Sequence, residues 1–327
     1  MRNINNSRAY KPRNKISRLF LTYIANLVFL LCGLHRTEVS AAENGFSFYV
    51  PGLYGDIAIA VPPAPGTYLL STSVYYSAKA PESLFPNEID QNINADVFAQ
   101  LLRGFWVPQE KFLGAQVLTG FRMSLMNTDI SVDFKPDTGL PPLSDQKVGF
   151  GDFAILPLSL YWQYDDIYIN LYQVVSIPTG KYDQSRLANV ALHHWVFNTV
   201  LAFTWLDPKT GIEISATPGI IFNTENKATN YQSGIEFHMD MMLNWRLSSS
   251  LTMGLHGSIY QQLTADKGAD PSIGDFKGQG YSLGPALIWN KTINEQTYYA
   301  SAKWLHEFGA KNKAEGDLMI FSAGIKF

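Results

Sequence analysis

Apolar and polar residues alternate with a period of two along most of the chain. Between Ile235 and Leu247 every odd position is apolar, whereas the even positions include full charges such as Glu236 and Arg246. A period of two points successive side chains to opposite faces of a strand, so each such stretch predicts a strand with one apolar and one polar face. Turn-forming residues separate twelve of these stretches. They lie near residues 67–79, 94–107, 113–127, 149–163, 166–177, 191–206, 210–223, 231–247, 250–263, 279–290, 295–308 and 317–327.

The apolar faces are too extensive to fill the interior of a single barrel, as they would in a soluble protein. The polar faces carry charged residues, which suits a water-lined interior with lipid outside. Short turns, such as residues 248–250, alternate with longer polar connections, such as residues 128–148 and 178–190. These are the expected periplasmic turns and extracellular loops. We therefore predict an all-β fold, a transmembrane antiparallel up-and-down β-barrel of about 12 strands over residues 67–327, preceded by an irregular N-terminal segment.

Residues 1–42 have the organisation of a secretory signal peptide. Six basic residues and no acidic residue precede a mostly apolar run from Leu19 to Leu34, and small residues follow. We expect cleavage near Ala41 or Ala42. Cys32, the only cysteine, lies in this leader, so the mature chain would contain no disulfide and no cysteine-ligated metal.

Composition agrees with an exported membrane barrel. Aromatic residues make up 13% of the chain and charged residues only 16%, below the quarter that is usual for globular proteins. Loss of the leader removes seven basic residues and one acidic residue, which changes the formal charge from −3 to −9. An acidic exported chain argues against nucleic acid as a partner.

Residues 43–66 contain four prolines and several glycines, a composition that excludes a regular hydrogen-bonded ladder. The segment also contains aromatic residues, including Phe46, Phe48, Tyr49 and Tyr54, which favour burial over a solvated tail. We expect this segment to pack at the periplasmic mouth or inside the lumen, as a hatch or constriction.

Ten residues are candidates for the lumen lining or the solute path, because they lie on polar faces or in turn motifs. They are Tyr54, Asp56, Arg122, Asp152, His194, Glu236, His238, Asp240, Arg246 and Lys303. Charges of both signs in a wall indicate either a selective lining or hydrogen-bond networks that only rigidify the barrel. Turn chemistry alone explains the two aspartates that follow glycine, Asp56 and Asp152. The histidines have neither a serine partner nor metal-ligand spacing, so we expect no catalytic residue, no metal site and no cofactor.

Five stretches resemble the family of outer-membrane proteins associated with the meta-cleavage pathway of phenol degradation. They are residues 43–66 with Val-Pro-Gly-Leu-Tyr-Gly-Asp, the Gly-Phe-Gly-Asp-Phe of residues 149–153, the Pro-Thr-Gly-Lys-Tyr of residues 178–182, residues 226–234, and the final Ala-Gly-Ile-Lys-Phe. This resemblance implies an outer-membrane barrel that moves hydrophobic or aromatic compounds. The terminal Phe327 is similar to the assembly signal that closes bacterial outer-membrane barrels.

The resulting hypothesis is an outer-membrane channel for passive uptake of small hydrophobic or aromatic compounds. Its expected partners are outer-membrane lipids, the barrel assembly machinery and those solutes. Two alternatives remain. One is a structural or adhesive barrel without flux, and the other is a barrel hydrolase acting on lipid, which requires a lipid-facing Ser–His pair.

Overall fold

The structure is a computed structural model that describes residues 47–55, 59–80, 91–134, 141–268 and 277–327. All of these residues belong to one compact unit, Glu38–Phe327. The leader expected over residues 1–42 and the candidate Asp56 lie outside the described residues, so both stay predictions. Within the described residues, no helix is long and apolar enough to cross a membrane.

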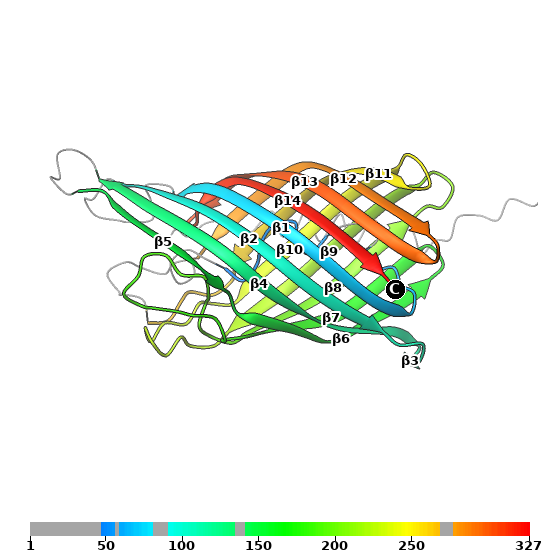
Figure 1. Cartoon of the computed structure of the whole chain (residues 1–327), viewed down its shortest axis with the longest axis horizontal. Helices are drawn as coiled ribbons and strands as arrows, with labels where there is room; N and C mark the ends of the chain where they lie inside the picture. Colours follow the sequence, from blue (N-terminus) through cyan, green and yellow to red (C-terminus); the bar gives the residue numbers. More distant parts are fainter. Residues whose placement is uncertain (1–46, 56–58, 81–90, 135–140, 269–276) are drawn as a thin grey trace, which may run out of the picture. The chain divides into compact units, whose positions relative to one another are not determined.

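The described chain is built from fourteen β-strands (Figure 1). In chain order they are β1 (Gly66–Ala80), β2 (Gln91–Val107), β3 (Lys111–Phe112), β4 (Ala115–Phe134), β5 (Leu143–Phe150), β6 (Phe153–Tyr164), β7 (Ile167–Ile177), β8 (Val196–Leu206), β9 (Ile212–Asn223), β10 (Glu236–Arg246), β11 (Leu251–Gln262), β12 (Gln279–Ile293), β13 (Gln296–Lys311) and β14 (Glu315–Lys326).

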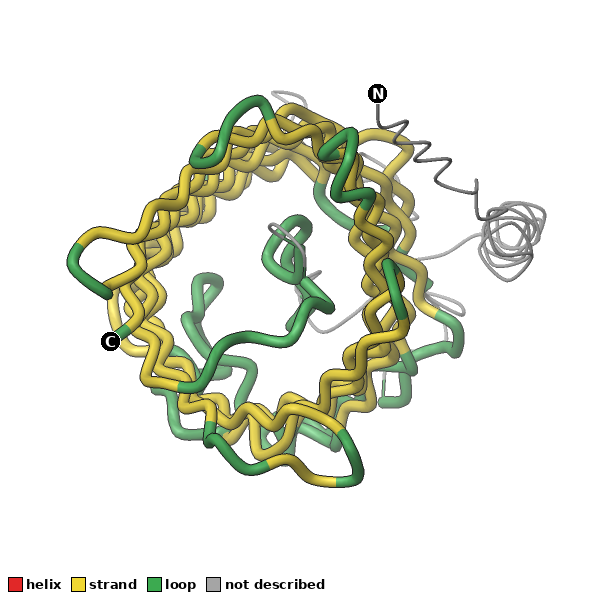
Figure 2. Tube along the Cα trace, turned by 90° about the vertical axis from the view of Figure 1, so that its right-hand side faces the viewer, coloured by secondary structure: helices red, strands yellow, loops and turns green. Residues whose placement is uncertain are grey.

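Twelve of these strands close into an antiparallel ring. Each pairs with its neighbour in sequence, and β1 also pairs with β14 from Tyr68↔Lys326 to Lys79↔Glu315. The short strands β3 and β5 pair only with β4 and lie outside the ring. Viewed end-on, the strands surround an interior that contains loop segments (Figure 2). The predicted all-β, up-and-down barrel of twelve strands is confirmed.

The sequence prediction was wrong on both sides of residues 135–140, where it expected a single long loop over residues 128–148. The aspartates of this stretch indicated a loop, yet β4 continues to Phe134 and β5 returns against it, with Ile130 and Val132 buried. Beta-branched residues on one face outweigh the turn preference of aspartate here. Strands β8 and β10 also begin later than predicted, at Val196 and Glu236.

The two faces of the wall follow the predicted parity. On β10, Leu243 and Trp245 are more than half exposed on the outside, whereas Glu236, His238 and Asp240 are at most 2% exposed inside. Closing the sheet into a barrel turns every second side chain inward. The polar residues of β10 therefore line the lumen, together with those of the neighbouring strands.

One end of the ring carries short turns and the other carries longer connections. Strands β12 and β13 are joined at Asn294 and Glu295, both with positive φ, which is the conformation of a type I′ turn. At the opposite end, residues 178–195 connect β7 to β8 and residues 224–235 connect β9 to β10. We call these the short-turn end and the long-loop end.

Candidate functional site

The chain that precedes β1 folds into the lumen. We call its described residues, 47–55 and 59–65, the inner segment. Phe48 and Tyr49 join a buried cluster with Val196, Ile221 and Tyr260 of the wall. Ala60 packs with wall residues of β7 and β8, and Val50 and Leu53 pack against residues of β1, β2 and β14. The inner segment thus contacts the wall on several sides.

Asp240 on β10 is the main polar anchor of the inner segment. Its Oδ1 accepts hydrogen bonds from the Tyr49 hydroxyl and from Gly52 N at 3.2 Å, and its Oδ2 accepts from Tyr54 N at 2.9 Å. Hydrogen bonds to a charged acceptor are the stronger kind. A single wall carboxylate therefore holds three points of the segment.

Lys303 on β13 holds the same turn from the other side. Its Nζ donates to the carbonyl oxygens of Gly52, at 2.7 Å, and of Gly55. Gly52 has φ +81°, and a Cβ at this position would lie 2.6 Å from Leu305 Cδ1. Glycine is favoured here by the backbone conformation, and a larger residue would also displace the Leu305 side chain.

Two further wall contacts fix the ends of the inner segment. The Ser47 hydroxyl donates to Glu236, whose other oxygen accepts from Asn223 Nδ2 at 2.7 Å. Ala60 N donates to Thr204 Oγ1 at 3.2 Å. Of the predicted lumen residues, Glu236, Asp240 and Lys303 thus form hydrogen bonds with the inner segment.

Aromatic rings stack where the inner segment meets β10 and β11. The centroid of the Tyr49 ring lies 4.4 Å from that of His238 and 6.1 Å from that of Tyr260, and both of these rings are nearly parallel to it. The ring centroids of Tyr54 and His238 are 4.8 Å apart. His238 Nε2 is 2.9 Å from Asn198 Oδ1. Arg122 on β4 lies over the Phe48 ring, with its Cζ 4.6 Å from the centroid. The predicted residues Tyr54, Arg122 and His238 therefore belong to one interior cluster.

Asp152 and His194 have a different role from the other candidates, because they hold the long-loop end together. Asp152 accepts hydrogen bonds from Gly180 N at 2.9 Å, Leu192 N at 2.8 Å and His193 N at 3.3 Å. His194 Nδ1 lies 2.9 Å from Leu192 O and its Nε2 lies 3.3 Å from Asn223 Oδ1. Leu192 in turn packs against the cluster that contains Phe48.

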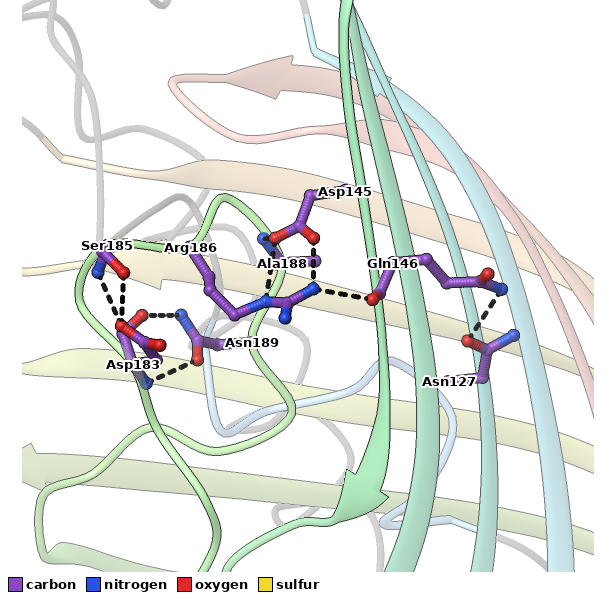
Figure 3. Close-up of polar contacts among 8 residues, drawn as sticks. All are labelled: Asn127, Asp145, Gln146, Asp183, Ser185, Arg186, Ala188 and Asn189. Atoms are coloured by element: carbon purple, nitrogen blue, oxygen red, sulfur yellow. Dashed lines mark hydrogen bonds and ion pairs between the residues drawn. The ribbon is translucent and has the colours of Figure 1, made fainter.

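A second contact fixes residues 178–195 to β5 (Figure 3). The Arg186 guanidinium donates to both oxygens of Asp145, and Ala188 N donates to Asp145 Oδ2 at 2.9 Å. The Ala188 amide and the Arg186 side chain stabilise the carboxylate and hold the pKa of Asp145 below its usual value. Residues 178–195 are therefore attached both to the barrel rim and to its extension, β5.

The predicted residue Arg246 lies outside the interior cluster, and some contacts of the inner segment with the wall were not predicted. Arg246 is exposed at the short-turn end of β10, where its N donates to Gly211 O at 3.0 Å. Ser47, Phe48 and Tyr49 contact the wall but were not among the candidates. The aromatic content of residues 43–66 was the available signal for Phe48 and Tyr49, whereas nothing in the sequence marked Ser47.

A hollow of about 470 Å³ lies near the short-turn end. Pro62 of the inner segment, Gln116 of β4 and Tyr161 of β6 line it, together with residues of the adjacent turns. The hollow leaves space between the inner segment and the wall on this side.

The geometry of a lipid hydrolase is not found among the described residues. The outward-facing His306 lies 3.1 Å from Asp317, and no described serine shares a hydrogen bond with it. The outward-facing Ser77 is opposite Asp317 on the other side of β14. Nor do three or more His, Cys, Asp or Glu side chains of the described chain gather in a way that could hold a metal ion.

Comparisons with solved structures support the fold. An outer membrane channel from Pseudomonas putida F1 superposes with a TM-score of 0.65 at 12% identity, covering 85% of this chain and 100% of the other. Two further barrels superpose less well. They are the transport unit of the autotransporter AIDA-I from Escherichia coli (TM-score 0.43, 8% identity, 84% of this chain and 93% of the other covered) and a Pseudomonas aeruginosa FadL homologue (TM-score 0.39, 9% identity, 90% and 99% covered).

Comparison with sequences identifies the family. A search of curated proteins returned no match. The family described as "Putative MetA-pathway of phenol degradation" matches residues 77–322, which is most of the chain and nearly all of the barrel. The chain therefore belongs to this family, as the motifs of the sequence indicated.

Proposed function

We propose that this protein is an outer-membrane channel for passive uptake of small hydrophobic or aromatic compounds, and that its inner segment acts as a hatch. The observation that carries the proposal is the inner segment itself, which lies in the lumen and is held by three charged wall residues, Glu236, Asp240 and Lys303. A segment held by side-chain hydrogen bonds and apolar packing can be released without breaking the strand ladder. The wall can therefore stay intact while the lumen opens.

The aromatic character of the interior supports the solute class. Tyr49, Tyr54 and His238 form a group of packed rings beside Tyr260, and release of the inner segment would uncover ring faces of the wall for a flat apolar solute. Aromatic pairs of this kind are favourable beyond the area that they bury. Membership of a family linked to phenol degradation agrees with this class.

The path that we propose runs from the long-loop end to the short-turn end. Residues 178–195 and β5 form the extracellular side, and the hollow beside Pro62 forms the periplasmic exit. Outer-membrane lipids would surround the exposed apolar face, and the barrel assembly machinery would insert the chain through its final strand and Phe327. The leader of residues 1–42 would direct export.

Uptake by intact cells tests this function. Cells that produce the full chain and cells with an empty vector would be given labelled toluene and, separately, a labelled disaccharide. We expect the protein to raise the initial rate of toluene uptake and leave disaccharide uptake unchanged. Equal stimulation of both solutes would mean a general hydrophilic pore, and stimulation of neither would favour the structural barrel without flux.

A further inference from the structure

Two arginines face each other across adjacent strands of the wall. Arg103 on β2 and Arg122 on β4 are direct partners in the antiparallel register. Their sequence neighbours Leu102 and Phe121 are exposed on the outside, 41% and 38%, so both guanidinium groups are directed to the lumen side. Both residues are only half-buried, which leaves them reachable from the interior.

Neither arginine forms an ion pair within the described part of the chain. Arg103 Nη2 donates to Thr72 Oγ1 at 2.6 Å, and Arg122 lies over the Phe48 ring. The Nε atoms of both are buried without a hydrogen-bond partner among the described residues. Tyr54 and Asp152 exert an electrostatic effect on Arg122, but among the described residues no hydrogen bond or ion pair joins either of them to its guanidinium group.

Such an arrangement is unfavourable unless an anion joins it. Like charges directly opposite each other on a strand pair destabilise the sheet, and a buried donor without a partner adds a further cost. A carboxylate that reaches the accessible part of the two guanidinium groups would counter both charges, because the planar guanidinium fork matches its two oxygens. Binding of an anion at this position would therefore reduce the repulsion between the two arginines.

The surroundings of the pair are apolar and aromatic. Phe48 covers Arg122, and Leu101 and Phe105 are the next residues of β2 on the lumen side of Arg103. A ligand that joins a carboxylate to a flat apolar body would match both the arginine pair and its apolar surroundings. An inorganic anion would use only the arginines.

We propose that Arg103 and Arg122 form an anion-binding site in the lumen for small aromatic carboxylates, of which benzoate is the simplest. The inference rests on the proposed function in that the ligand is taken to be a solute of the channel. It narrows the solute class from aromatic compounds in general to those that carry an acid group.

Calorimetric titration of the refolded mature protein tests the site, with benzoate and its neutral analogue benzyl alcohol as probes. We expect benzoate to bind at least tenfold more tightly than benzyl alcohol, and R103Q/R122Q to abolish this difference. R246Q is the matched control, since it removes one arginine from the exposed end of β10, and it should leave benzoate affinity unchanged. R122K retains the charge but not the fork and should weaken benzoate binding about three- to tenfold.

Several results would overturn the site. They are equal affinity for benzoate and benzyl alcohol in the wild type, an equal loss in R246Q, or displacement of benzoate by an equal concentration of inorganic phosphate. If R103Q/R122Q fails to fold, judged by its gel mobility with and without heating, the wild-type comparison and R122K decide. Toluene uptake without preferential benzoate binding would refute the site alone, whereas benzoate binding without uptake of either solute would refute the channel function alone.

Discussion

Replacing Asp240 by alanine tests how the inner segment is held. The substitution removes the acceptor of three hydrogen bonds, from the Tyr49 hydroxyl, Gly52 N and Tyr54 N. It leaves the strand ladder of β10 in place, because the backbone pairs Asp240↔Ser258 and Asp240↔Thr217 do not depend on the side chain. The barrel should therefore fold while the segment loosens.

The size of the effect follows from the number and type of bonds lost. A hydrogen bond to a charged group contributes about 1.5–3 kcal/mol, so three contribute about 4.5–9 kcal/mol at most. Part of this is recovered, because the variant no longer buries a charge and the freed donors can bind lumen water. We take about 3 kcal/mol as the net loss, which at about 1.4 kcal/mol per factor of ten raises the ratio of released to held segment about a hundredfold.

Single-channel recording in planar bilayers measures this ratio as open probability. The matched control is E307A, because Glu307 is also a buried lumen acid with three donors, Tyr76 Oη, Lys313 Nζ and Gly316 N. None of these donors belongs to the inner segment. We expect D240A to open much more often than the wild type and E307A to behave like the wild type. Equal open probabilities in D240A and E307A would refute the assignment of Asp240 as the anchor.

Three further predictions follow from individual contacts. K303M removes the donor to the Gly52 and Gly55 carbonyls and should also raise open probability, though less than D240A; an unchanged value would mean that Lys303 only supports the wall. A probe on L187C should report release of residues 178–195 only below pH about 4. The pKa of Asp145 is lower in the folded protein than its ordinary value of about 3.9. Its contact with Arg186 therefore stabilises this loop at and above that ordinary value and loses the effect as the pH falls through the folded pKa. D145N should lack this transition, and release near pH 6 in the wild type would contradict the Asp145–Arg186 contact. Deletion of Phe327, whose N donates to Thr67 O at 2.9 Å, should lower the amount of heat-modifiable barrel in the outer membrane, and normal assembly would exclude its role as a signal.

The barrel could be predicted from the sequence because apolar and polar residues alternate along a strand that has lipid on one face and water on the other. On β10, the odd and even positions differ so clearly that parity alone assigns Asp240 to the lumen. The extension formed by β4 and β5 could not be predicted in this way. Its aspartates resemble loop residues, and only the pairing with the facing strand shows that Ile130 and Val132 are buried.

The contacts of the candidate site depend on folding over long sequence distances. Tyr49 and Asp240 are 191 positions apart, and neither residue specifies the other locally. Sequence parity therefore identified wall residues without showing which of them hold the inner segment. It also assigned Arg246 to the lumen, because period alone does not show where along a strand the wall ends.

In the proposed mechanism, the N-terminal segment closes the lumen and its release opens it. Conductance of the refolded mature protein in planar bilayers, with and without residues 43–66, tests this most directly. We expect the complete mature protein to be largely silent and the truncated one to show stable open steps. Open steps of the same size and frequency in both forms would contradict it.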